Sequence, residues 1–226
     1  GDILLGAGHA YLSLMDGESA WTGTLDKSSA TAAGTMTLNL ANGARWTNQR
    51  LFLGDSVKAA PVIERFTGGA SLANAGVIDQ THGDDLTFKN YSGNTIVWYG
   101  HTIADGVDRD GYPAKVPTVQ GGKITITSAA AGSEIHLRTD SAGFDFTSNA
   151  VAERNLISAT LNALANKLYY EDYAANPSHL KAYVEIGEGL IGSSARISKE
   201  ITTFAQTNPA DGTDFQGNPF NTEDKQ

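Results

Sequence analysis

Short stretches in which apolar and polar residues alternate recur along the chain as far as Leu137, and each is followed by a turn and a second short apolar segment. The alternating stretches are 12–14, 38–40, 86–88 and 124–126, and the turns lie at Gly17, Gly43, Gly93 and Gly132. Alternation with a period of two is typical of a strand with one buried face. Asn-Gly and Asp-Gly steps supply the positive φ that sharp turns need. The pattern predicts a repeated unit of short strands.

A repeated unit of about 20 to 25 residues is too small to bury its own apolar face. Stacking such units buries a continuous core. We therefore expect a mostly-β protein that forms a right-handed parallel β-helix, a kind of solenoid. Asn-Gly turns are also strong hairpin signals, so a sandwich of antiparallel hairpins is the alternative fold.

The three tryptophans of the chain, Trp21, Trp46 and Trp98, fall at one phase of this repeat. Residues at one phase of a stacked fold line up as a ladder. A ladder that points inward forms core, because a large aromatic side chain buries much apolar surface. A ladder that points outward would offer a platform for sugar rings. The inward arrangement is the favoured one, although the sequence does not decide between the two.

Residues 150–170 change character, because apolar residues recur there at helical spacing. The apolar positions are Ile157, Leu161, Leu164 and Leu168, with Asn149 placed to cap the start and Pro177 beyond the end. We expect one α-helix that packs against the solenoid. The predicted organisation is solenoid rungs over 1–149, this helix over 150–170, further rungs or a cap over 171–206, and a linker or tail over 207–226.

Two segments are assigned on composition and alternation. Residues 105–120 contain two glycines and two prolines and are expected to form a surface loop. Residues 182–186 alternate as a strand, whereas 193–206 fit either a helix or a strand.

Composition removes several classes of function. The net charge of −9 repels phosphate backbones and anionic lipid, so we expect no nucleic-acid partner. No apolar run approaches the roughly 20 residues that span a bilayer, so this segment is not expected to insert into a membrane. The chain has no cysteine, which excludes disulfides and thiol catalysis, and it begins at Gly1, which indicates a processed protein or a fragment.

Residues 36–47 resemble rung sequences of autotransporter passenger domains, and 123–127 with 161–170 resemble segments of very large repetitive surface proteins of Gram-negative bacteria. This resemblance implies a β-helix exposed outside the outer membrane, acting as an adhesin, a surface-layer component or a stalk. The motif encodes the shape of a rung and implies no catalytic or binding residue.

Three glycine-containing stretches, 187–192, 6–8 and 122–123, imitate nucleotide-binding motifs. The first matches G-x-G-x-x-G after a strand, but no second strand ending in an acidic residue follows it. The second lacks its third glycine, and in the third Ile124 stands where a phosphate loop needs Ser or Thr. We interpret the first as a glycine corner between rungs, and we discard the other two as nucleotide-binding motifs.

The five histidines are His9, His82, His101, His136 and His179. Their spacing includes no i, i+4 pair, so we expect turn or surface positions and no metal site. Asp105, Asp108, Asp110 and Gly111 form half of a calcium loop, but Gly106 and Pro117 break its register. Weak calcium binding near 105–111 is left open.

Paired carboxylates are the strongest candidates for enzymatic chemistry. Glycoside cleavage needs two carboxyl groups at a defined separation, and Asp84 with Asp85, or Asp108 with Asp110, are candidates by residue type. The alternative interpretation places these acids in turns facing solvent.

The sequence as a whole favours a non-enzymatic structural or adhesive segment of a secreted bacterial cell-surface protein, with no cofactor. Expected partners are a host or cell-surface glycan or protein, with end-to-end self-association or continuation in a larger chain also conceivable. The alternatives are a polysaccharide-active β-helix enzyme and a carbohydrate-binding module or capsid-type appendage.

Overall fold

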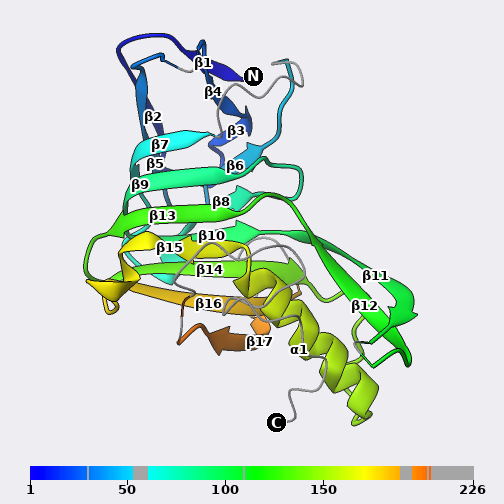
Figure 1. Cartoon of the computed structure of the whole chain (residues 1–226). Coiled ribbons are helices and arrows are strands. Elements are labelled where there is room, and N and C mark those ends of the chain that lie inside the picture. Colours follow the sequence, from blue (N-terminus) through cyan, green and yellow to red (C-terminus); the bar gives the residue numbers. More distant parts are fainter. Residues whose placement is uncertain (30, 53–60, 109, 189–194, 203, 205–226) are drawn as a thin grey trace.

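The computed structural model describes residues 1–29, 31–52, 61–108, 110–188, 195–202 and 204. Two large β-sheets face each other, and one α-helix lies beside them (Figure 1). The six-stranded sheet contains β2 (His9–Leu14), β5 (Thr35–Leu40), β7 (Val62–Thr67), β9 (Leu86–Ser92), β13 (Ile124–Ala129) and β15 (Leu168–Tyr170). The seven-stranded sheet contains β3 (Ala20–Gly23), β6 (Arg45–Asn48), β8 (Gly76–Asp79), β10 (Asn94–Trp98), β14 (Ser133–Asp140), β16 (Leu180–Gly187) and β17 (Ala195–Glu200).

The remaining elements flank these sheets. Strands β1 (Ile3–Leu5) and β4 (Leu25–Lys27) form a small parallel pair, and β11 (Gly100–Val107) and β12 (Pro113–Gln120) form an antiparallel hairpin. The helix is α1 (Val151–Ala165), and two short 3₁₀ turns are η1 (Leu72–Asn74) and η2 (Glu171–Ala174). Figure 1 shows the strands stacked from the N-terminal end to the C-terminal end, with the hairpin and α1 projecting to one side.

The chain alternates between the two large sheets. It runs from β2 to β3, then from β5 to β6, and continues in this way to β15 and β16. We call each such pair, one strand in each sheet, a pass of the chain. Within each sheet, neighbouring strands come from successive passes and pair in parallel, as in the register of Leu12 with Leu38 and of Leu38 with Phe66. The exception is β17, which runs antiparallel to β16.

The prediction of a mostly-β protein with one helix is confirmed. A right-handed parallel β-helix is not shown, because the sheets are parallel in one case and mixed in the other. Two segments depart from the parallel arrangement. Strand β17 runs back antiparallel to β16, and the antiparallel β11–β12 hairpin is inserted between β10 and β13.

The four glycine turns of the repeat are corners between the two sheets, and three of them, but not Gly17, have left-handed backbone angles. Asn42 and Gly43 have φ values of 54° and 79°, and Gly93 and Gly132 have 80° and 81°. Only glycine, and less readily asparagine, adopts such angles without strain. Each of these turns joins a strand of one sheet to a strand of the other, so the alternative of antiparallel hairpins in a sandwich is wrong for this part of the chain.

The core lies between the two sheets and is built from alternate residues of their strands. On β5, Met36, Leu38 and Leu40 are fully buried, while the residues between them face outward. Aromatic side chains continue the core along the stack, since the ring centroids of Phe66 and Phe88 lie 4.7 Å apart. Stacking of the passes therefore removes from water the apolar faces that no single pass could bury.

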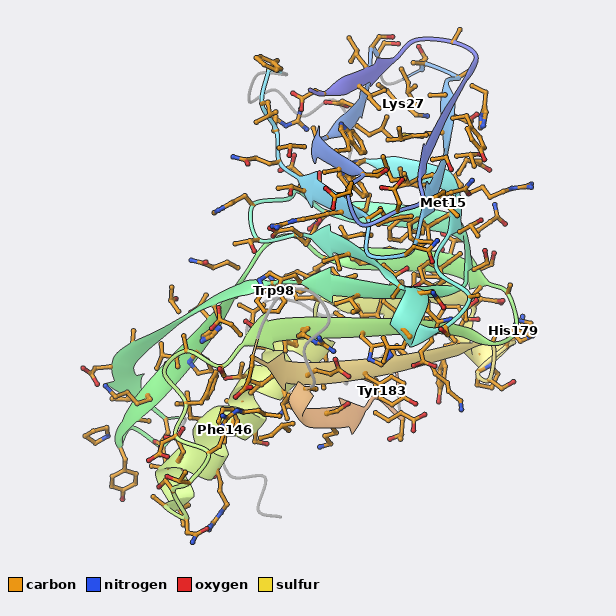
Figure 2. The ribbon with its side chains drawn as sticks, turned by 180° about the vertical axis from the view of Figure 1, so that it is seen from behind. Met15, Lys27, Trp98, Phe146, His179 and Tyr183 are labelled. Atoms are coloured by element: carbon orange, nitrogen blue, oxygen red, sulfur yellow. The ribbon has the colours of Figure 1, made fainter. Side chains whose placement is uncertain are left out.

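Two of the three tryptophans form the expected inward ladder. Trp21 and Trp46 are in register, and their rings stack with centroids 4.9 Å apart and planes 8° from parallel. The third does not join them, because Trp46 aligns with Ile78 and Ile78 aligns with Val97. Trp98 is therefore displaced by one residue, which turns its side chain to the opposite face of the sheet (Figure 2).

The helix is shorter than the predicted 150–170. It ends at Ala165, and Leu168 begins β15, which pairs with β13. Ala150 stands at the N-cap without a side-chain hydrogen bond, so Asn149 is not the cap. The leucine at position 168 continues the helical spacing, but pairing with a buried strand overrides it. Across the described residues, no helix has the length and apolarity needed to cross a bilayer.

The loop expected over 105–120 is wrong, because most of this segment forms the β11–β12 hairpin. Pro113 and Pro117 lie on β12. A strand in a two-stranded hairpin has a free edge, so a residue without an N–H group can be accommodated there. The predicted strand over 182–186 is confirmed within β16, part of 193–206 forms β17, and 207–226 lies outside the described residues.

We predict that Trp46→Ala strongly destabilises the protein. The side chain of Trp46 is fully buried and its indole N–H donates to the Gly23 carbonyl at 2.9 Å, so truncation should cost about 3–5 kcal/mol of unfolding free energy. Trp98→Ala is the control and should cost less than half as much, because Trp98 is only partly buried. Urea unfolding followed by far-UV circular dichroism measures both, and equal losses would contradict the assignment of core and outer faces.

Candidate functional site

Three neighbouring strands of the six-stranded sheet share an irregularity at the same level, which we call the bend. At 64–65, 89–90 and 127–128, two consecutive residues face outward, so the alternation of buried and exposed residues is interrupted. These three positions line up, since Arg65 pairs with Asn90 and Asn90 pairs with Ser128. Because the strands are parallel and in register, the irregularity occurs at equivalent positions in all three.

Side chains at the bend satisfy the backbone groups that the bend leaves without a strand partner. The Asn90 side-chain amide donates to the Glu64 carbonyl at 2.9 Å, and the Ser128 hydroxyl donates to the Lys89 carbonyl at 3.0 Å. Such bonds compensate for lost strand pairing, because an unpaired carbonyl is costly. The bend is therefore a built feature of the sheet.

A depression of about 450 Å³ opens on the outer face of the six-stranded sheet where β7 separates from β5. Pairing between these strands includes Thr37 with Arg65 and the two positions after it, whereas the first half of β7 pairs with β9 alone. Three strands contribute to the wall. The lining residues are His9 and Tyr11 of β2, Thr35, Thr37 and Asn39 of β5, and Glu64 and Arg65 of β7.

Hydrogen bonds hold the side chains of the depression in place. The two ring nitrogens of His9 lie 2.7 Å and 2.9 Å from the hydroxyl oxygens of Thr35 and Thr37. The Asn39 amide donates to the hydroxyl oxygen of Tyr11 at 2.5 Å, while the Tyr11 side chain remains 66% exposed. An aromatic ring and an imidazole are thus presented to solvent in fixed positions.

The charges of the six-stranded sheet are few and gather at the bend. Its strands contain one acidic residue, Glu64, and two basic residues, Arg65 and Lys89. Glu64 and Lys89 form an ion pair at 3.1 Å. Arg65 is exposed, and among the described residues no ion pair or hydrogen bond engages its guanidinium. The strands of this sheet therefore carry a net positive charge, in a protein whose overall charge is −9.

A second polar cluster lies on the outer face of the seven-stranded sheet, which faces the viewer in Figure 2. The buried carboxylate of Glu185 accepts from the Arg138 guanidinium at 2.7 and 2.9 Å and lies 2.8 Å from Nδ1 of His136. Nε2 of His136 lies 2.5 Å from the Glu134 carboxylate, and the Ser198 hydroxyl donates to Glu185 at 3.0 Å. The cluster ties β14, β16 and β17 together.

Burial and charge act in opposite directions on the titrating groups of this cluster. Burial alone would raise the pKa of Glu185, yet His136 and Arg138 lower that pKa to about 2. Burial alone would lower the pKa of His136, yet Glu185 and then Glu134 raise it above its ordinary value. The buried side chains of His136, Arg138 and Glu185 all have charged partners within hydrogen-bonding distance, so we interpret the cluster as structural.

The carboxylates that the sequence offers for glycoside cleavage have structural partners. Asp84 accepts from the Arg50 guanidinium at 2.9 and 3.2 Å, and Arg50 also reaches buried Asp26 at 3.1 Å. Asp85 accepts from the Lys123 backbone N–H at 2.8 Å. These contacts link corners of neighbouring passes.

The other acidic candidates lie in the β11–β12 hairpin. Asp105 pairs with Lys115 at 2.6 Å across the hairpin, and Asp108 accepts the backbone N–H groups of Asp110 and Tyr112 at 2.9 Å. Asp108 thus stabilises the turn. Within the ranges that the structure describes, no group of three or more acidic or histidine side chains is arranged to hold a metal ion.

The glycine stretches have different outcomes. Gly122 packs so closely on the Asp84 backbone that an added Cβ would lie 2.4 Å from it, which accounts for a glycine there without a phosphate. Gly8 has a φ of 87° and precedes β2 rather than a helix. Most of 187–192 lies outside the described residues.

Sequence reasoning missed both polar clusters. His136 was expected at a turn or surface but is buried in a strand, 49 residues from its partner Glu185. Arg65 was not singled out at all. The available signal was the adjacent outward pair at 64–65 and again at 89–90, each interrupting an otherwise alternating strand.

Comparisons with models of protein families, with curated proteins and with solved structures find no match to this chain.

We predict that Glu185→Gln destabilises the protein in a pH-dependent manner. The ion cluster contributes stability above the ordinary Glu pKa of 4.5 that is lost as pH falls toward 2. The His136 contribution is present below its ordinary pKa of 6.5 and is lost as pH rises through the raised value. The loss should therefore peak near pH 5 to 6, at about 3–5 kcal/mol.

Urea unfolding at pH 3, 5.5 and 9 measures this effect. Ser198→Ala is the control, because it removes one hydrogen bond to Glu185 and should cost about 1 kcal/mol at both pH 5.5 and pH 9. A loss for Glu185→Gln that stays constant across the three pH values would contradict the coupling of Glu185 to His136.

Proposed function

We propose that this chain is a non-enzymatic structural and adhesive segment of a secreted bacterial cell-surface protein, and that its passes form the coils of a right-handed β-helix. The observation that carries the proposal is the exposed polar face of the six-stranded sheet. Its ligand would be a saccharide, bound without turnover.

The strand order supports the β-helix part of this proposal. Successive passes place one strand in each sheet and pair in parallel with the pass before, which is how coiled β folds extend. A fold of this kind can grow by adding passes at either end, and its length makes it suitable as a spacer.

The polar face supports the adhesive part. Two rows of polar side chains run across the strands in register, separated from strand to strand by about 4.8 Å. The rows are Tyr11, Thr37, Arg65, Asn90 and Ser128, and Ser13, Asn39, Thr67 and Ser92. Hydroxyl and amide groups donate and accept hydrogen bonds at once, as sugar hydroxyls do. An array of such groups is suited to an extended saccharide.

The rival proposal, a polysaccharide-active enzyme, draws less support from the described residues. Asp84, Asp85 and Asp108 accept hydrogen bonds from their own chain. The sugar-platform role once open to the tryptophans is not available to Trp21 and Trp46, which are buried between the sheets.

We predict that the protein binds saccharides and returns them intact. The test is a panel of bacterial, plant and host polysaccharides immobilised for binding, with the same polysaccharides incubated overnight and sized by mass spectrometry. Binding without fragments is expected. Shortened or unsaturated products would overturn the non-enzymatic assignment, and failure to bind any polysaccharide would overturn the adhesive one.

A pair of matched variants locates the binding face. Thr67→Val removes a hydroxyl from the six-stranded sheet and should weaken binding about fivefold, equivalent to one hydrogen bond. Thr47→Val removes a hydroxyl from the outer face of the seven-stranded sheet and should leave binding unchanged. The reverse result would place the ligand on the other face.

A further inference from the structure

We infer that the depression beside β7 binds an anionic saccharide, with Arg65 as the group that recognises its carboxylate or sulfate. This inference names the ligand class of the proposed adhesive face and therefore rests on that proposal. It depends on three features of the depression: an available guanidinium, a low local negative charge, and a pre-formed polar wall around a volume of suitable size.

The first feature is a guanidinium that the fold leaves available. Arg50 and Arg138 form structural ion pairs with Asp84 and Glu185, respectively. Arg65, by contrast, projects outward from the bend and has no charged partner among the described residues. Arginine presents two parallel N–H donors that match the two oxygens of a carboxylate or sulfate.

The second feature is that the one carboxylate lining the depression, Glu64, is paired with a lysine. A protein of net charge −9 repels anions in general. The strands of the six-stranded sheet contribute a single carboxylate, Glu64, and Lys89 neutralises it at 3.1 Å. An anion approaching this face therefore meets a net positive charge, and the Debye length of about 8 Å in physiological salt screens it from more distant acids.

The third feature is the pre-formed wall opposite Arg65. The imidazole of His9 is held between two threonine hydroxyls, and the Tyr11 ring is fixed by Asn39. An exposed aromatic face packs against the C–H face of a sugar ring, while the polar groups around it fix the orientation. The volume of about 450 Å³ falls within the range of about 300–1,000 Å³ that is typical of small-molecule sites.

The arrangement predicts which part of the ligand lies where. The charged group of one sugar residue contacts Arg65, and the ring of that residue or of its neighbour lies on Tyr11. Thr37 stands between them in the same row, since it pairs with Tyr11 on one side and with Arg65 on the other. Recognition therefore combines one ionic contact with one stacking contact.

Calorimetric titration with defined tetrasaccharides tests this inference. The probes are a galacturonic acid tetramer for the carboxylate, a sulfated galactose tetramer for the sulfate, and an uncharged galactose tetramer as the neutral reference. The wild-type protein should bind at least one anionic probe about tenfold more tightly than the neutral one, and added salt should reduce this preference. The stronger of the two anionic probes identifies the charged group.

Three variants assign the effect to the depression. Arg65→Gln should weaken binding of the preferred anionic probe about tenfold and leave the neutral probe within about twofold. Lys181→Gln makes the same change in net charge on the exposed surface of β16 and should leave both affinities within about twofold. Tyr11→Ala should weaken all bound probes alike, by about fivefold.

The outcomes separate this inference from the proposed function. Equal binding of neutral and anionic probes, or equal losses for Arg65→Gln and Lys181→Gln, would overturn the anionic site while leaving saccharide adhesion in place. Failure of the wild-type protein to bind any saccharide in the broader panel would overturn the proposed function as well. Circular dichroism spectra identical to the wild type exclude misfolding, which is not expected because Arg65 and Tyr11 are exposed.

Discussion

The apolar layer between the two sheets is the constraint from which the other features follow. Each pass of the chain supplies a few inward side chains, such as Met36, Leu38 and Leu40, which only neighbouring passes can cover. Parallel pairing keeps equivalent residues in line from pass to pass. Because of this alignment, a local irregularity is repeated along the stack: the outward pair at 64–65 is matched at 89–90 and 127–128. One of these outward pairs, 64–65, forms part of the wall of the surface depression.

The strands and corners could be predicted because their signals are local. Alternation identifies the segments around 38–40 and 86–88, and the left-handed angle at Gly43 follows from the residue itself. Register is a different matter, because it is set between strands distant in sequence. Trp98 keeps the spacing of the repeat yet faces away from Trp46, since a displacement of one residue exchanges the two faces of a strand. No pattern within one strand reveals such a displacement.

The polar clusters were beyond sequence reasoning for the same reason. The sequence pattern drew attention to acidic pairs such as Asp84 and Asp85, which are adjacent in sequence. In the structure, these two side chains accept hydrogen bonds that link corners of neighbouring passes. The groups that the fold brings together, His136 with Glu185 and Tyr11 with Arg65, belong to different passes. The breaks in alternation at 64–65 and at 89–90 were the available signal of a specialised surface, and they could be interpreted only once the neighbouring strands were known.

Each of the two outer faces carries an arginine, but the two side chains have different surroundings. On the seven-stranded sheet, Arg138 is buried, and the cost of removing a guanidinium from water is offset only because Glu185 accepts two of its hydrogen bonds. That arrangement leaves the group with little to offer a ligand. On the six-stranded sheet, Arg65 is exposed and lines a depression in which the side chains of His9 and Tyr11 are already hydrogen-bonded. A ligand there would exchange water for an oxyanion at small cost in ordering, which is the condition for selective binding by so few groups.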